Sequence, residues 1–215
     1  GACGHDSGTV DTNGKSADAT GYVKPSNIEQ SDQFGYAVAV SGDGLTMAIG
    51  APYEDSSSPT NPNDNTALDA GAVYIFRQNG SGSWSQEAYL KAPLPGAGDL
   101  FGYSVSLSDD GNTLAVGAPY EASNAISSII SNPTGTSFDE QNNTAAAAGA
   151  VYIFIRNGTT WTANAYMKAS NTGAGDLFGT AVALSGDRLY LAVSAPGEDS
   201  NRKNIIVSNP DNSSA

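Results

Sequence analysis

The chain has 215 residues, which suits one sizeable domain or two small ones, and its 22 acidic and 9 basic residues give a formal net charge of −13. This charge argues against a nucleic-acid partner, because binding to phosphates needs a basic surface. Charged residues make up 14% and hydrophobic residues 39% of the chain, against about 25% and roughly 45–50% in typical globular domains. Since small and polar residues fill the difference, we expect a β-rich extracellular protein.

Residues 1–19 are polar and contain several glycines, and they predict a flexible N-terminal tether. Gly1-Ala2-Cys3 has two interpretations. It is the end of a bacterial lipoprotein signal whose cleavage leaves a lipidated Cys3, or it is a cloning remnant or a free thiol near a disordered end. No apolar run approaches the ~18 residues that span a bilayer. A lipid anchor on Cys3 is therefore the one route to a membrane that the sequence offers.

Cys3 and His5 are the single cysteine and the single histidine of the chain. A disulfide within the chain and a zinc site built on paired Cys or His are excluded. Nucleophilic catalysis with a histidine base would have to use His5, which lies in the predicted tether. No other catalytic motif stands out, and we predict that the protein is not an enzyme.

Three segments share a pattern that begins with Phe-Gly, at Phe34, Phe101 and Phe178. Each continues with alternating large and small residues, which is typical of a half-buried strand. Sixteen residues after each phenylalanine the sequence reads Gly-Ala-Pro or Ser-Ala-Pro, beginning at Gly50, Gly117 and Ser194. A second strand precedes each of these triplets, and the Asp-Gly chemistry between the two strands predicts a two-residue hairpin turn.

Two of the segments continue with the same two elements. Gly-Ala-Val-Tyr-Ile-Phe, at 71–76 and 149–154, is rich in β-branched and aromatic residues and predicts a buried third strand. A stretch that begins with Trp and ends with Lys, at 84–91 and 161–168, predicts an outer fourth strand. Each full repeat therefore predicts four short strands.

The spacing of Phe-Gly and Gly-Ala-Pro resembles the FG-GAP repeat of integrin-α-type β-propellers, specifically their bacterial secreted and surface group. The resemblance implies an all-β fold of blades, each a four-stranded antiparallel sheet arranged around an axis. It places one FG-GAP repeat domain at 20–215, with blade 1 at about 32–92, blade 2 at about 99–169 and a partial blade 3 at about 176–215. It also implies adhesion or protein interaction outside the cell or on the bacterial surface, with a protein or surface ligand as partner.

The repeats add up to about two and a half blades plus one orphan strand, which aligns with 89–92 and 166–169 and consists of Tyr22, Val23, Lys24 and Pro25. Because propellers close with roughly 4–8 blades, three alternatives stand open. The chain is part of a longer protein, or it is an open monomer, or the orphan strand of one copy completes blade 3 of another. The last alternative gives head-to-tail self-association into an extracellular filament. Its predicted contact residues also include Ile205, Ile206 and Val207.

Acidic residues recur in the loops of one predicted rim, namely Asp32, Glu54, Asp55, Asp99, Glu121, Asp176, Glu198 and Asp199. They have two interpretations. They ligate Ca²⁺, which takes 6–8 oxygen ligands, or they are solvated turn residues that bond locally to the backbone. Integrin-type repeats carry an Asp-x-Asp-x-Asp-Gly loop between strands one and two, and only a tight hairpin stands there in this chain. The family's usual calcium site is therefore not carried over, and calcium at the rim is the one predicted cofactor.

Overall fold

The computed structural model describes residues 22–25, 27, 29–80, 82–125 and 143–199, together with the backbone of the short strands at 9–10, 16–17 and 130–131. Every regular element in this part of the chain is a β-strand. The first two, β1 (Thr9–Val10) and β2 (Ser16–Ala17), pair with each other inside the predicted tether. The described part of the chain contains no helix capable of crossing a membrane.

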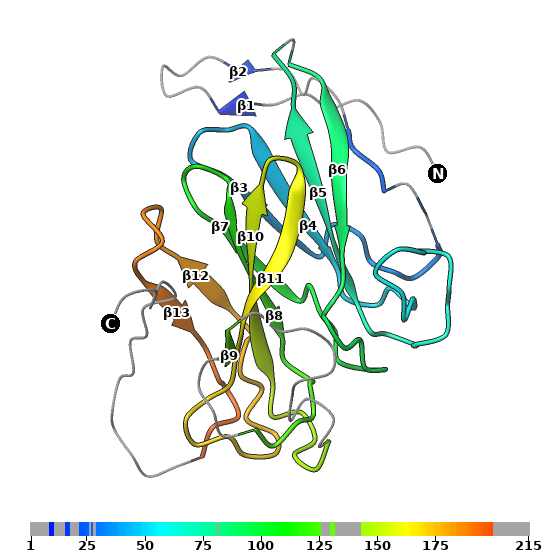
Figure 1. The fold of residues 1–215 in the computed structure, drawn as a ribbon, viewed down its shortest axis with the longest axis vertical. Helices are drawn as coiled ribbons and strands as arrows, with labels where there is room; N and C mark the ends of the chain where they lie inside the picture. The colour runs from blue at the N-terminus through cyan, green and yellow to red at the C-terminus, as the bar shows by residue number, and fades with distance from the viewer. Residues whose placement is uncertain are drawn as a thin grey trace.

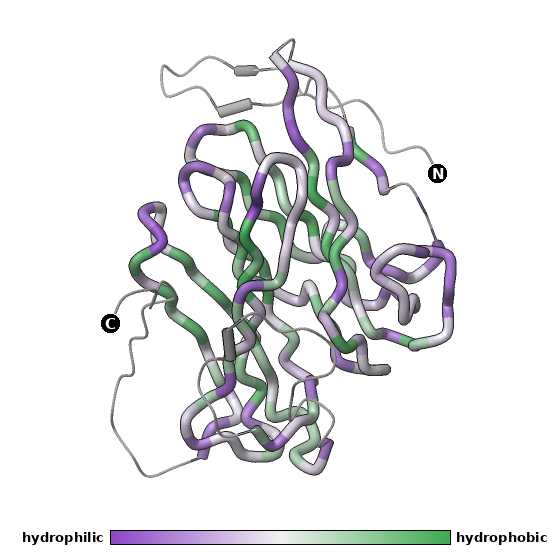
Figure 2. The backbone as a smooth tube through the Cα atoms, viewed as in Figure 1, coloured by the Kyte–Doolittle hydropathy of each residue, from purple (hydrophilic) through white to green (hydrophobic). Residues whose placement is uncertain are grey.

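Blade 1 is a four-stranded antiparallel sheet in the order β3-β4-β5-β6. Its strands are β3 (Ala37–Val40), β4 (Thr46–Ala51), β5 (Ala72–Gln78) and β6 (Trp84–Leu90). The Val-Tyr-Ile-Phe run forms β5, which lies inside the sheet and is buried from Ala72 to Phe76. The hydropathy tube shows the same division, with hydrophobic strands and hydrophilic turns (Figure 2).

Blade 2 repeats this plan with β7 (Ser104–Leu107), β8 (Thr113–Ala118), β10 (Ala150–Asn157) and β11 (Thr160–Met167). Blade 3 consists of β12 (Val182–Leu184) and β13 (Leu191–Val193) in the described residues. The three sheets follow one another across the molecule (Figure 1). The predicted fold, FG-GAP blades that form an incomplete propeller, is confirmed.

Three details differ from the sequence-based expectations. The turn after β3 is longer than two residues, because Asp43 accepts bonds from the Ser41 hydroxyl and the Leu45 amide and closes a wider loop. Blade 2 gains a fifth strand, β9 (Ile130–Ser131), which pairs with β11. The segment 22–25 forms no strand ladder, although we expected an orphan strand there.

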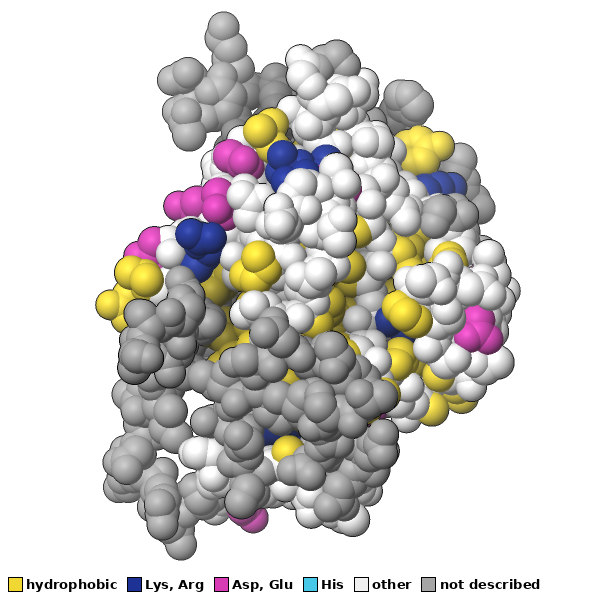
Figure 3. Space-filling model, in the orientation of Figure 1, with side chains coloured by type: hydrophobic (Ala, Val, Ile, Leu, Met, Phe, Trp, Pro, Cys, Tyr) yellow, Lys and Arg dark blue, Asp and Glu magenta, His cyan; other side chains and the backbone are white. Residues whose placement is uncertain are grey.

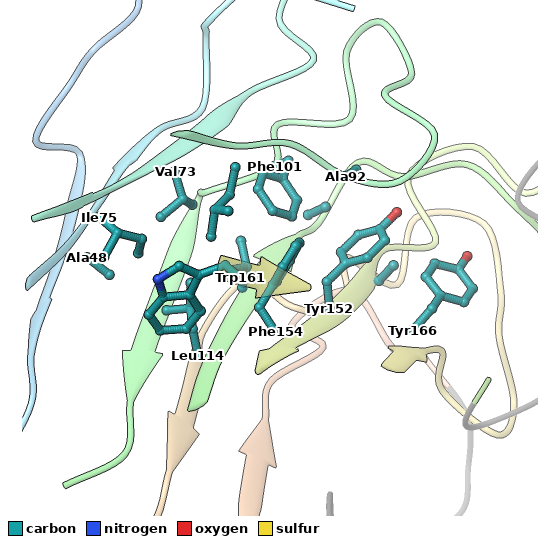
Figure 4. Close-up of a cluster of buried hydrophobic side chains, with 14 of the residues drawn as sticks. Ala48, Val73, Ile75, Ala92, Phe101, Leu114, Tyr152, Phe154, Trp161 and Tyr166 are labelled. Atoms are coloured by element: carbon teal, nitrogen blue, oxygen red, sulfur yellow. The ribbon is translucent and has the colours of Figure 1, made fainter. Parts of the chain in front are cut away.

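Neighbouring blades pack through opposite faces. We call the side of a blade that is turned toward the preceding blade its near face, and the other side its far face. Small and aliphatic side chains on the far face of blade 1, including Ala48 and Ile75, meet the aromatic near face of blade 2, including Phe101, Tyr152 and Phe154 (Figure 4). The aromatic rings pack edge to face, with centroids 5.4 and 5.9 Å from Phe101.

The blade 2–blade 3 interface uses the same arrangement. Ala115, Val151 and Ile153 on the far face of blade 2 pack against Leu184 and Leu191 on the near face of blade 3. These side chains are all at most 9% exposed. The repeat therefore encodes one type of blade interface and uses it twice.

Glycines allow the backbones of adjacent blades to touch. A Cβ atom on Gly50 would lie 2.0 Å from the carbonyl oxygen of Gly102, and one on Gly117 would lie 2.0 Å from that of Gly179. The Phe101 amide also donates to the Ala70 carbonyl of blade 1 at 3.1 Å. Only a residue without a side chain fits at these joints, which explains the Gly of Gly-Ala-Pro.

Candidate functional site

The loops that carry the predicted acidic residues lie at one edge of each blade. Within a blade, β3 begins and β4 ends at the same edge of the sheet, so the loop that enters the first strand and the loop that joins the second and third strands lie together. We call this edge, with its equivalents in the other blades, the rim. Its acidic side chains differ in their surroundings, and five of them are buried.

Glu54 and Glu121 are held in buried ion pairs. The Lys91 ammonium lies 2.7 Å from Glu54 Oε2, and the Lys168 ammonium lies 2.7 Å from Glu121 Oε2. The four side chains are at most 3% exposed. Each lysine follows the last strand of its blade, so the pair ties β6 or β11 to the loop between the second and third strands.

A serine two residues after each glutamate extends this arrangement. The Ser56 amide donates to Glu54 Oε2 at 3.2 Å, and the Ser123 amide donates to Glu121 Oε1 at 3.0 Å. In blade 2 the Ser123 hydroxyl also lies 2.6 Å from the Tyr166 hydroxyl, another residue of β11. The network orders the loop through these bonds, although Glu54 Oε1 is buried without a hydrogen-bond partner in the described residues.

Asp32 and Asp99 precede the Phe-Gly pairs and are buried beside these glutamates. Burial, followed by repulsion from Glu54, raises the pKa of Asp32 to about 6. Burial, followed by repulsion from Glu121, raises the pKa of Asp99 to about 7. The Asp99 carboxylate accepts a bond from the Gly96 amide at 3.0 Å. The turn interpretation expects such a local backbone bond, but it also expects a solvated side chain, whereas Asp99 is buried.

The remaining predicted ligands are placed differently. The Asp55 carboxylate accepts a bond from the Asp69 amide at 2.8 Å, and the Asp176 carboxylate accepts one from the Gly173 amide at 2.7 Å. Glu198 accepts a bond from the Asn171 side chain, and Asp199 is exposed.

The described residues contain no group of three or more His, Cys, Asp or Glu arranged to hold a metal ion. Calcium binding stays a prediction that the structure does not test. Sequence reasoning did not identify the roles of Lys91 and Lys168, although both recur at the end of the Tyr-Leu-Lys and Tyr-Met-Lys motifs. That recurrence was the available signal.

A cluster of tyrosines lies at the inner end of the rim. Tyr36 and Tyr103 come directly before the first strands of blades 1 and 2, and Tyr53 and Tyr120 follow the second strands. The ring centroid of Tyr36 is 4.8 Å from that of Tyr103 and 6.5 Å from that of Tyr53. A hydrogen bond to Tyr103 raises the pKa of Tyr36 to about 12. Tyr36 and Tyr120 are 44% and 46% exposed.

Among the predicted assembly residues, Val23 is partly buried against the near face of blade 1, beside Tyr89. Tyr22 is 83% exposed, and the Lys24 ammonium lies 5.4 Å from the centroid of its ring. Pro25 is partly buried. Cys3 and the segment 205–207 lie outside the described residues, so the predicted lipidation and the predicted tail contact stay predictions.

Comparison with known families places the repeats independently of the geometry. The family model described as FG-GAP repeat matches residues 22–76, 84–128 and 161–205, and its first match begins at the Tyr22 segment. A search of curated proteins finds no match. FG-GAP repeats are generally found in extracellular or surface proteins and are typically non-enzymatic. Together with the three in-phase blades, these matches mean that the chain belongs to the FG-GAP repeat family.

Proposed function

We propose that this chain is a non-enzymatic adhesion module that works outside the cell or at the bacterial surface and binds a protein or surface ligand through its rim. The tyrosine cluster of Tyr36, Tyr53, Tyr103 and Tyr120 is the observation that carries the proposal. Exposed aromatic clusters are uncommon on proteins without a binding partner. Tyrosine in particular provides large rigid contact surfaces with a hydrogen-bonding tip.

Two further observations support a role in binding for this cluster. Its rings belong to none of the three hydrophobic core clusters, so their packing inside the fold does not account for them. On the face shown in Figure 3, backbone and side chains that are neither hydrophobic nor charged cover much of the described surface, hydrophobic side chains lie between them, and Lys and Arg are few. Such a surface suits ligands that bind by stacking and hydrogen bonding.

A binding assay with paired variants tests the proposal. The purified chain is titrated against a panel of immobilised extracellular proteins and surface polysaccharides, and the double variant Tyr36→Ser/Tyr103→Ser is compared with wild type. We expect at least about tenfold weaker binding, which corresponds to the loss of one hot-spot contact. Tyr190→Ser is the matched control, because Tyr190 is 59% exposed on blade 3, away from this cluster. Undiminished binding by the double variant would contradict the proposal.

Calcium assistance is part of this proposal and has its own test. The support is the excess of carboxylates at the rim, of which Asp55 and Asp199 form no ion pair within the described residues, unlike Glu54. Calorimetric titration with CaCl₂ should show saturable binding that Asp55→Asn weakens. The same ligand assay in EGTA should show a loss of affinity, whereas equal affinity in both buffers would refute calcium assistance.

A second candidate function is that of a structural subunit in a self-assembling extracellular filament. It is favoured by the exposure of Tyr22 and Lys24, whose equivalents Tyr166 and Lys168 are buried in blade 2. Negative-stain electron microscopy and light scattering on the intact chain test it. Polymers that disappear when residues 1–27 are deleted would support the filament, and a monodisperse monomer at high concentration would exclude it.

A further inference from the structure

In the described residues, no blade covers the near face of blade 1. Ile49, Tyr74 and Phe76 are buried there and Val23 and Phe34 pack against them, but the side chains of β3 on this face stay exposed. Val40 of β3 occupies the same position as Leu107 and Leu184 in the next two blades. Val40 is 55% exposed, whereas Leu107 and Leu184 are 8% and 9% exposed because a preceding blade covers them. Its neighbour Val38 is 56% exposed. Blade 1 therefore presents apolar side chains of the kind that the other blades bury against a neighbour.

The far face of blade 3 presents the opposite surface. Ala192 of β13 occupies the position of Ala48 and Ala115, which are both fully buried under the following blade. Ala192 is exposed, as is Ala183 beside it on β12. Inside the molecule, Ala48 of a far face lies in the cluster with the aromatic near face of blade 2, and Ala115 lies in the cluster with Leu184 and Leu191 on the near face of blade 3. The exposed face of blade 3 thus matches the exposed face of blade 1.

Charged residues match across the same two surfaces. Lys24 occupies the position of Lys91 and Lys168, and Val23 already packs on blade 1 as Leu90 packs between blades 1 and 2. Glu198 of blade 3 occupies the position of their partners Glu54 and Glu121 and is only partly buried. If the near face of blade 1 packed against blade 3 of another copy, Lys24 of the first copy would lie beside Glu198 of the other copy.

One residue departs from the repeat at this contact. Blade 3 has Ser194 at the position of Gly50 in blade 1 and Gly117 in blade 2. At both glycines, a carbonyl oxygen of the next blade lies 2.0 Å from the place where a Cβ atom would be. A serine there has a real Cβ, and its hydroxyl accepts a bond from the Ala181 amide at 2.9 Å. The Gly35 carbonyl of an approaching blade 1 could not reach the usual position without a shift of backbone.

We propose that the far face of blade 3 binds the near face of blade 1 of a second copy, with Lys24 paired to Glu198, and that Ser194 keeps this contact weak and reversible. The proposal rests on the self-assembly candidate above and specifies its surfaces and its limiting residue. It extends an interface that the chain already forms twice, so it requires no new type of packing. The contact is head to tail, so it adds copies in one direction.

Sedimentation velocity over a concentration series tests the role of Ser194. We expect Ser194→Gly to associate about tenfold more tightly than wild type, since it removes an overpacked atom. Ser194→Ala is the matched control: it loses the hydroxyl but keeps the Cβ, and it should behave like wild type. Association of Ser194→Gly no tighter than that of wild type would overturn the inference. If Ser194→Gly associates no more tightly than wild type, the filament candidate still stands when both the variant and wild type associate. It fails when both stay monomeric.

A charge exchange tests the pairing separately, on the Ser194→Gly chain. Lys24→Glu and Glu198→Lys should each weaken association severalfold, because each places like charges together. The double variant Lys24→Glu/Glu198→Lys should recover most of the loss. Circular dichroism of all four chains checks that the blades stay folded. Failure of the double variant to recover, with all chains folded, would overturn the proposed orientation.

Discussion

The buried pair of Lys168 and Glu121 allows a quantitative prediction. The two side chains are 0% and 3% exposed, and their charged atoms are 2.7 Å apart. Lys168→Met keeps the length of the side chain but removes its charge, which leaves Glu121 buried beside the carboxylates of Asp99 and Asp176. Removing one partner of a buried pair typically costs about 3–5 kcal/mol. We expect a loss of this size in the free energy of unfolding at pH 8.

The assay is urea denaturation followed by tryptophan fluorescence and circular dichroism. The double variant Lys168→Met/Glu121→Gln should recover part of the loss, because it leaves no unpaired charge. The chain also provides an exposed pair as control. Arg188 and Asp110 are 3.7 Å apart and each is 46% exposed, so Arg188→Met should cost only about 0–1 kcal/mol.

The pH dependence adds a second measurement on the same variant. The charge of Lys168 lowers the pKa of Asp99, so without Lys168 that pKa should rise further and the loss should be smaller at pH 5, where Asp99 is protonated, than at pH 8. A loss below about 1 kcal/mol at pH 8, equal to that of the exposed control, would refute the structural role of the pair. So would a double variant that is less stable than Lys168→Met.

Two further predictions concern the same fold. The pKa of Asp99 is raised to about 7 from an ordinary 3.8, so the folded chain holds this proton more tightly than the unfolded chain does. The free energy of unfolding should therefore fall as the pH rises from about 4 to 7, with a slope of up to about 1.4 kcal/mol per pH unit. Asp99→Asn should therefore flatten the pH dependence of the urea midpoint and be more stable than wild type at pH 8, and an unchanged profile would contradict this. Gly117→Ser should cost about 1–3 kcal/mol, because its Cβ would meet the Gly179 carbonyl. Gly80→Ser, with nothing within 4 Å, is the matched control, and equal urea midpoints for the two variants would exclude a role for the glycine joint.

The blades could be predicted from the sequence because their signals are local and repeated. The alternation after Phe-Gly, the Val-Tyr-Ile-Phe run and the Gly-Ala-Pro triplet each fall within one strand or one turn, and their recurrence fixes the strand order. The predicted hairpin length was wrong because the bonds that the Asp43 carboxylate accepts from Ser41 and Leu45 decide it, and the Asp-Gly signal does not reveal them.

The candidate site was predicted less well, because its partners are distant in the chain. Lys91 and Glu54 are separated by 37 positions and Lys168 and Glu121 by 47, so spacing alone shows no relation between them. The acidic residues were visible as a repeated pattern, but whether a carboxylate is buried depends on the sheet that folds over it. The tyrosines were missed because Tyr36 and Tyr103 fall within the alternating pattern that the strands explain.

The buried pairs and the exposed tyrosines separate two roles that share one rim. The Glu–Lys pairs order the loops between the second and third strands, so their loss should lower stability before it affects any ligand. The tyrosines precede the first strands or follow the second strands and contribute to no core cluster in the described residues, so their loss should affect a ligand and leave the urea midpoint unchanged. Variants that change stability without changing binding, and others that change binding without changing stability, would establish that the ion pairs and the tyrosines have separate roles. If Lys168→Met and Tyr36→Ser instead changed both properties together, the rim would have to act as a single unit in which the ion pairs themselves take part in binding.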